Sequence, residues 1–126
     1  MAKRLSRLAV TATALLALTL ATGSRADDIP LVTGKQWTDS NEQAKKAYLV
    51  GIANLAQVDI AFHEGKPPSD TQSIVPRFAR GLKGQSLDSV RQGLDRWYAA
   101  HPDQLQRPVI ETIWFEMVVP GLRTNK

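Results

Sequence analysis

RWYAAHPDQLQRPVIETIW, residues 96–114, is the stretch that decides how this chain folds. It holds three aromatic residues, two prolines and one of the two histidines of the chain. The residue before a proline is pushed out of the helical region, so His101-Pro102 is predicted to end one helix and the second proline to open the next. We interpret the stretch as a joint between two helices rather than a reactive site. Its aromatic residues are predicted to fill that joint; they are Trp97, Tyr98 and Trp114.

Hydrophobic periodicity predicts a helix on each side of this joint. Upstream, Ser86 is typical of an N-cap, and apolar residues follow it at helical spacing until His101. Downstream, residues 109–119 are bracketed by Pro108 and Pro120. Their spacing favours a helix, although many of them also suit a β-strand.

A longer helix is predicted from Ser40 to about His63. Ser40-Asn41-Glu42-Gln43 fits a capping box, in which the first serine and the glutamine three residues later bond each other's backbone. One helix face carries Ala44, Tyr48, Gly51, Leu55, Val58 and Phe62, and a second apolar set widens it: Leu49, Ile52, Ala53, Ala56 and Ile60. A helix this apolar is central in its bundle or is covered by a second copy, so a homodimer is a further expectation. The mid-helix Gly51 indicates a close helix approach at that point.

Two weaker segments complete the expected domain. Residues 71–82 have helical spacing and are predicted to form a short helix that ends at Gly81, before a break at Gly84. Residues 27–36 contain a proline and a glycine and are predicted to be a loosely ordered leader. The sequence therefore predicts an all-α fold, a small domain resembling a four-helix bundle.

The first 26 residues have the pattern of a cleaved signal peptide. A basic start is followed by an uncharged run rich in alanine and leucine over 8–22. Ser24-Arg25-Ala26 then has small residues at the positions that a signal peptidase reads before the expected cleavage point after Ala26. That run is too short to span a bilayer as a helix. We therefore expect residues 27–126 to form one domain, periplasmic or secreted, with no membrane association after cleavage.

Charge and cysteine content narrow the function classes. Cleavage after Ala26 would remove four of the 16 Lys and Arg and none of the 12 Asp and Glu, so the remaining charges balance. Nucleic-acid binding, which needs a cationic surface, then has no compositional support. The chain has no cysteine, so we expect its stability to depend on packing alone.

No reactive constellation stands out in the sequence. Asp59 and His63 are four residues apart and can meet on one helix face, which we interpret as a solvated pair rather than half of a metal or acid–base site. His101 is placed to cap a backbone group at the joint. We therefore predict no catalytic residue, no metal ligand and no cofactor, and we expect the chain not to be an enzyme.

A protein partner is the expected ligand. A loop stiffened by two prolines follows the long helix and is predicted to project toward a partner; its residues are Gly65, Lys66, Pro67, Pro68, Ser69 and Asp70. A basic group on the next segment is a second candidate contact, suited to an acidic surface; it comprises Arg77, Arg80 and Lys83.

The chain resembles the Rap/Tai group, small exported immunity proteins that protect against type VI secretion amidase effectors. The resemblance covers roughly residues 37–120 and lies in Ala47-Tyr48-Leu49-Val50-Gly51-Ile52, Val90 to Tyr98, His101-Pro102, Leu105 and Pro108. It implies an all-α, dimeric periplasmic protein that blocks the active-site cleft of a peptidoglycan amidase. Members carry cysteines that this chain lacks, and Val119-Pro120-Gly121 stands where a Pro-Cys ending is expected.

Two functions therefore stay open at the level of the sequence. The first is an immunity protein with a single amidase partner. The second is a periplasmic helical protein that is chaperone-like, or an accessory subunit, and uses the apolar surface of the first helix.

Overall fold

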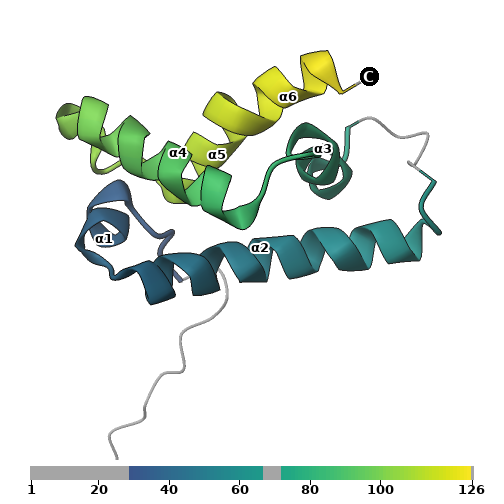
Figure 1. Ribbon diagram of the computed structural model, residues 1–126, viewed down its shortest axis with the longest axis horizontal. Coiled ribbons are helices and arrows are strands. Elements are labelled where there is room, and N and C mark those ends of the chain that lie inside the picture. Colours follow the sequence, from purple (N-terminus) through teal and green to yellow (C-terminus); the bar gives the residue numbers. More distant parts are fainter. Residues whose placement is uncertain (1–28, 67–71, 126) are drawn as a thin grey trace, which may run out of the picture.

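The computed structural model describes residues 29–66 and 72–125, and these residues are largely helical (Figure 1). The elements in chain order are α1 (Gly34–Asp39), α2 (Glu42–Phe62), α3 (Ile74–Gly81), α4 (Leu87–Ala100), η2 (Pro102–Gln104), α5 (Val109–Ile113), η3 (Trp114–Val118) and α6 (Val119–Thr124). No β-strand occurs in the described ranges, so the all-α prediction is confirmed. The predicted signal peptide, residues 1–26, lies outside them.

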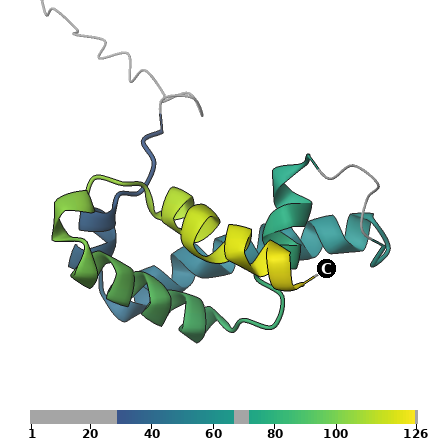
Figure 2. The same cartoon turned by 90° about the horizontal axis from the view of Figure 1, so that it is seen from above.

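The helices form two layers. Figure 1 shows α2 as one layer, with α3, α4 and the C-terminal helix on the same side of it, and Figure 2 shows α3 running across α2. The core lies between the layers and is formed by Trp37, Leu49, Phe78, Val90, Leu94, Tyr98, Val109, Ile113 and Val118. None of the helices in the described ranges is both long and apolar enough to cross a bilayer.

The N-terminal segment is ordered, which corrects the expectation of a loose leader up to Gln36. Thr33 caps α1 in a capping box, because its side chain accepts from the backbone N–H of Gln36 and the Gln36 side chain accepts from the backbone N–H of Thr33. Backbone N–H groups of Gly34 and Lys35 donate to the carbonyl groups of residues 107 and 105. Trp37 is buried in the core as a result.

The N-cap of the long helix lies one residue later than predicted. Asn41, not Ser40, is the N-cap of α2, and its side chain accepts from the backbone N–H of Ala44. Ser40 instead ends α1, where its hydroxyl donates to the carbonyl of Gln36. The capping prediction failed because the short helix α1 occupies the residues that were expected to be a loop.

The joint predicted at residues 96–114 is confirmed for its first half. Tyr98 is buried and its hydroxyl donates to the carbonyl of Arg107 at 2.9 Å. Trp97 is stacked on His101, and the Arg107 guanidinium lies over the Trp97 ring. The Nδ1 of His101 donates to the Trp97 carbonyl at 2.7 Å, so this ring has the predicted capping role. Trp114 does not return to the joint; it packs on Phe78 of α3.

The segment after Pro108 is a helix rather than a strand, and it continues beyond Pro120 to Thr124, which corrects its expected end. A π-helical turn, η3, allows the helix to continue past the proline. The backbone N–H of Val119 bonds the carbonyl of Trp114, five residues earlier. Because the wider turn shifts the hydrogen-bond pattern just before Pro120, the missing N–H of the proline falls within a ladder that is already rearranged.

The closest backbone approach lies between α3 and α6, not at Gly51 as predicted. A Cβ on Gly81 would lie 2.5 Å from the Val118 carbonyl oxygen, and a Cβ on Gly121 would overlap the carbonyl of Gly81. Gly51 has no atom within 4 Å of the position where its Cβ would stand. The side chain of Asn125 also donates to the carbonyl of Arg80, at 3.2 Å, and so holds the C-terminal end against α3.

The two apolar sets of α2 have different environments. The second set faces the core side, where Leu49 is buried and Ile52 is partly buried. The first set was expected to be covered as well. Its C-terminal members are instead exposed in the structure; they are Leu55, Val58 and Phe62.

Candidate functional site

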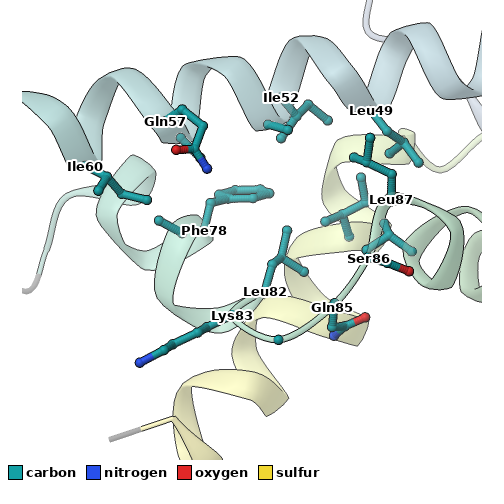
Figure 3. Close-up of a pocket in the computed structure, with 16 residues that line it drawn as sticks. Leu49, Ile52, Gln57, Ile60, Phe78, Leu82, Lys83, Gln85, Ser86 and Leu87 are labelled. Carbon is teal, nitrogen blue, oxygen red and sulfur yellow. The ribbon is translucent and has the colours of Figure 1, made fainter. Parts of the chain in front are cut away.

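An apolar groove opens between the core side of α2 and the helices α3 and α4. It encloses about 330 Å³, and we call it the α2–α3 groove. Its apolar lining comprises Leu49, Ile52, Ala53, Ala56, Ile60, Phe78, Ala79, Leu82, Leu87, Val90 and Ile113. Figure 3 shows Ile52, Phe78 and Leu82 directed into the space between the ribbons. The groove exists because alanines face each other where α2 and α3 meet, so the facing surfaces do not fill the space.

Polar side chains occupy the rim of the groove. They are Gln57 of α2 together with Lys83, Gln85 and Ser86 of the connection that leads from α3 into α4. The Ser86 hydroxyl accepts from the backbone N–H of Ser89 and is part of the capping box of α4. This serine therefore has a structural role at the rim, and it confirms the predicted N-cap.

A second, basic pocket of about 310 Å³ adjoins the groove. The two share Ile60, Ala79 and Lys83 in their linings. The remaining residues of the basic pocket are Asp59, His63, Gly65, Lys66, Pro76 and Arg80. The apolar groove thus lies next to a pocket that is lined by three cationic side chains.

These three cations have no anionic partner among residues 29–66 and 72–125. The ion pairs of the described residues involve other side chains, and none includes Lys66, Arg80 or Lys83. Asp59 is the carboxylate in the pocket lining, and its Oδ1 lies 3.5 Å from the Nδ1 of His63. That Nδ1 is also 2.9 Å from the Asp59 carbonyl, so the predicted Asp59–His63 pair is confirmed as a contact at the helix end.

The backbone at the end of α2 turns the chain into this pocket. Glu64 and Gly65 have positive φ angles of 52° and 72°, and the N–H of Gly65 donates to the carbonyl of Ile60. This left-handed ending is the usual way in which a helix is closed by glycine. Lys66, which follows this turn, and Arg80 of α3 both line the pocket.

The structure brings four of the predicted partner-binding residues together. Gly65, Lys66, Arg80 and Lys83 line one pocket, although they come from two predicted groups separated along the chain. Arg77 is half-buried on α3 and does not line this pocket. The four remaining residues of the predicted loop lie outside the described residues: Pro67, Pro68, Ser69 and Asp70.

The apolar half of the site was not predicted as a site. The signal was present in the second apolar set of α2, which includes Ile52, Ala56 and Ile60. We interpreted this set as a wider core face. Only the position of α3 across α2 shows that part of that face lines an open groove.

The two adjoining pockets have the chemistry to hold an amphipathic group. The groove can take an apolar side chain or chain segment, and the adjacent cations can hold an anion next to it. Within the described part of the chain no group of three or more His, Asp or Glu side chains could hold a metal ion. Comparison with protein-family models, with curated proteins and with solved structures gives no match for this chain.

Proposed function

We propose that this chain is a small protein-binding domain, exported from the cytoplasm, that captures one partner protein at the α2–α3 groove. The observation that carries the proposal is that the apolar groove adjoins a pocket lined by Lys66, Arg80 and Lys83, three cations with no ion-pair partner among the described residues. A partner segment with an apolar side chain next to a carboxylate could bind the apolar groove and the cations at the same time. The buried anchor would supply most of the affinity, and the charges would steer the encounter.

The resemblance to the Rap/Tai group supports a peptidoglycan amidase effector as this partner. In that case the domain would act as an immunity protein, covering the active-site cleft of the amidase. Gly65 and Lys66, the first two residues of the predicted loop, line the basic pocket. We expect the loop to enter the cleft of the amidase while the basic side chains beside it bind the surrounding surface.

The test is binding and inhibition of an amidase encoded beside this chain. Isothermal titration should give one-to-one stoichiometry and a tight complex in which amidase activity is lost. Replacing Arg80 and Lys83 together by glutamate should weaken binding at least tenfold, because two attractive charges become repulsive. A matched control is Arg96→Glu, an exposed charge on α4 outside both pockets. Wild-type affinity in the double variant would show that the basic pocket is not the contact.

A chaperone-like protein or accessory subunit is the second candidate, and the exposed apolar face of α2 favours it. Such a protein would bind many unfolded clients through Leu55, Val58 and Phe62. It would suppress aggregation without fixed stoichiometry. Suppression that survives the Arg80 and Lys83 double change, together with no amidase binding, would support this role over the first.

A further inference from the structure

The α2–α3 groove is elongated, and its two ends differ in chemistry. Its α2 wall runs from Leu49 to Ile60, which spans about 17 Å at about 1.5 Å per residue. At the Leu49 end the groove reaches the core, where Val90 and Ile113 are buried. At the Ile60 end it meets the basic pocket, and Figure 3 shows Lys83 at this end. The groove is therefore closed by apolar side chains at one end and bounded by cations at the other.

The interior of the groove suits an alkyl chain better than a peptide. Small side chains on both walls keep the space open, and they are Ala53, Ala56 and Ala79. The described residues leave no buried side-chain nitrogen or oxygen without a hydrogen-bond partner, so no polar atom of the lining needs a ligand. An extended peptide along the groove would bury its own backbone N–H and C=O groups without partners, which is costly. An alkyl chain has no such groups.

The basic pocket complements a single anion at the open end. Lys66, Arg80 and Lys83 have no ion-pair partner among the described residues, and Asp59 is the carboxylate that those residues contribute to the lining. Three positive charges against one negative charge leave the pocket cationic. A carboxylate bound here would receive charge-assisted hydrogen bonds, and the guanidinium of Arg80 has the fork that fits both of its oxygens.

We propose that the two pockets together bind one long-chain fatty acid, with its alkyl chain in the α2–α3 groove and its carboxylate in the basic pocket. Two estimates of the chain length agree. An extended alkyl chain advances about 1.25 Å per carbon, so a length of about 17 Å takes about 13 carbons. A methylene is about as large as a water molecule, about 30 Å³, so the groove of about 330 Å³ holds about eleven of them.

Fatty-acid binding goes beyond the capture of a protein partner and does not depend on it. An apolar side chain of a partner would fill only part of the groove, whereas an alkyl chain would fill its whole length. Both ligands would use the same cations. Where a protein partner binds at the groove, the fatty acid should therefore compete with it.

Isothermal titration of the purified protein with saturated fatty acids, below their micelle concentrations, tests the site. One acid should bind per chain. The affinity should rise about fourfold per methylene from octanoate to tetradecanoate, because each added methylene leaves water for the groove. It should then level off for hexadecanoate and octadecanoate, whose ends no longer fit. Absence of binding overturns the proposal, and so does an affinity that keeps rising to octadecanoate, because the chain would then lie on an open surface.

The head group is tested by its charge. Dodecyltrimethylammonium has the same chain as dodecanoate with a cationic head, and it should bind at least tenfold more weakly. Replacing Arg80 and Lys83 together by glutamine should weaken dodecanoate binding about tenfold. The fold should persist, because Asn125 bonds the backbone carbonyls of these two residues and not their side chains. The control Arg96→Gln, on α4 outside both pockets, should bind like the wild type. Equal binding of the cationic amphiphile would refute the assignment.

The position of the alkyl chain is tested by filling the groove. Ala56→Phe should weaken dodecanoate binding at least tenfold, and Ala47→Phe, at an exposed position of the same helix outside both pockets, should not. Val58→Ser removes an apolar side chain from the outer face of α2, where Val58 is 66% exposed, and should also leave binding unchanged. Loss of binding in Val58→Ser would place the acid on that outer face and would contradict the proposal. If Ala56→Phe does not fold, the chain-length series and the charge variants still decide.

None of these titrations contains a protein partner. Failure of the amidase test therefore leaves the fatty-acid prediction unchanged, and a chain that binds no fatty acid leaves the amidase test unchanged.

Discussion

Replacing Gly81 by alanine should destabilise the protein, although alanine is the better helix former. The added Cβ would lie 2.5, 2.7 and 2.8 Å from the carbonyl oxygen, Cγ1 and Cα of Val118. Two of these three atoms are backbone, so rotation of one side chain cannot relieve the overlap. The φ angle of Gly81 is not positive, so the effect is purely steric.

The magnitude follows from two opposing terms. Alanine gains up to about 1 kcal/mol in helix propensity. Overpacking of a tight contact costs about 1–3 kcal/mol, and here α3 must also move away from the C-terminal helix. We expect a net loss of about 1–2 kcal/mol in the free energy of unfolding, which lowers Tm by about 5–10 °C for a domain of this size.

The matched control is Gly51→Ala. It is the same substitution inside a helix, at a site with no atom within 4 Å of the new Cβ. It should raise the free energy of unfolding by about 0.5–1 kcal/mol. Urea denaturation at low protein concentration keeps self-association out of the comparison. Equal or greater stability of Gly81→Ala relative to the wild type would refute the reasoning that backbone contact sets the α3–α6 distance.

Three further outcomes are expected. Tyr98→Phe should lower the free energy of unfolding in urea by about 1–2 kcal/mol, because the Thr112 hydroxyl at 2.9 Å loses a partner. Asp95→Ala should lower it by about 1–3 kcal/mol, because the buried Trp37 Nε1 donates to this carboxylate at 2.8 Å; a conservative Asp95→Asn variant should recover part of the loss. Burial raises the pKa of Tyr48 and of Tyr98 above 10.0. The neutral phenols therefore stabilise the fold fully below pH 10, and this contribution is lost as the pH rises through their folded-state pKa. The Tm should fall above pH 10, and it should fall less steeply in Tyr98→Phe, which has one buried phenol fewer.

The helices could be predicted because local signals mark them. Ser86 and His101-Pro102 bracket α4, and Gly81 ends α3 as its position suggested. Thr33-x-x-Gln36 carries the local signal of a capping box, as Ser40-x-x-Gln43 does, and only the first of the two forms one. What the sequence does not show is the backbone pairing with residues 105 and 107, which holds this segment in place.

The site was predictable only in part. Lys66 was predicted as part of the projecting loop and Arg80 as part of the basic group, and the structure places both in the lining of one pocket. The apolar groove beside them depends on the crossing of α2 and α3, which the periodicity of either helix does not determine. The periodicity of α2 predicted two apolar faces. It did not predict which face is buried, because that depends on where the other helices pack.

The π turn at Trp114–Val118 accounts for one odd step in the spacing of the C-terminal helix. Val109 and Ile113 are four residues apart, but the next fully buried residue is Val118, five further on. In a regular α-helix, a step of five residues instead of four would rotate the part of the helix after Ile113 by about 100°. Val118 would then be directed away from α3. The turn therefore absorbs one surplus residue, as if a single codon had been inserted into an ancestral helix. Removing the codon for the exposed Phe115 would restore the four-residue step between Ile113 and Val118. It would also place Pro120 in a regular α-helical ladder, where its missing N–H is no longer accommodated by the wider turn.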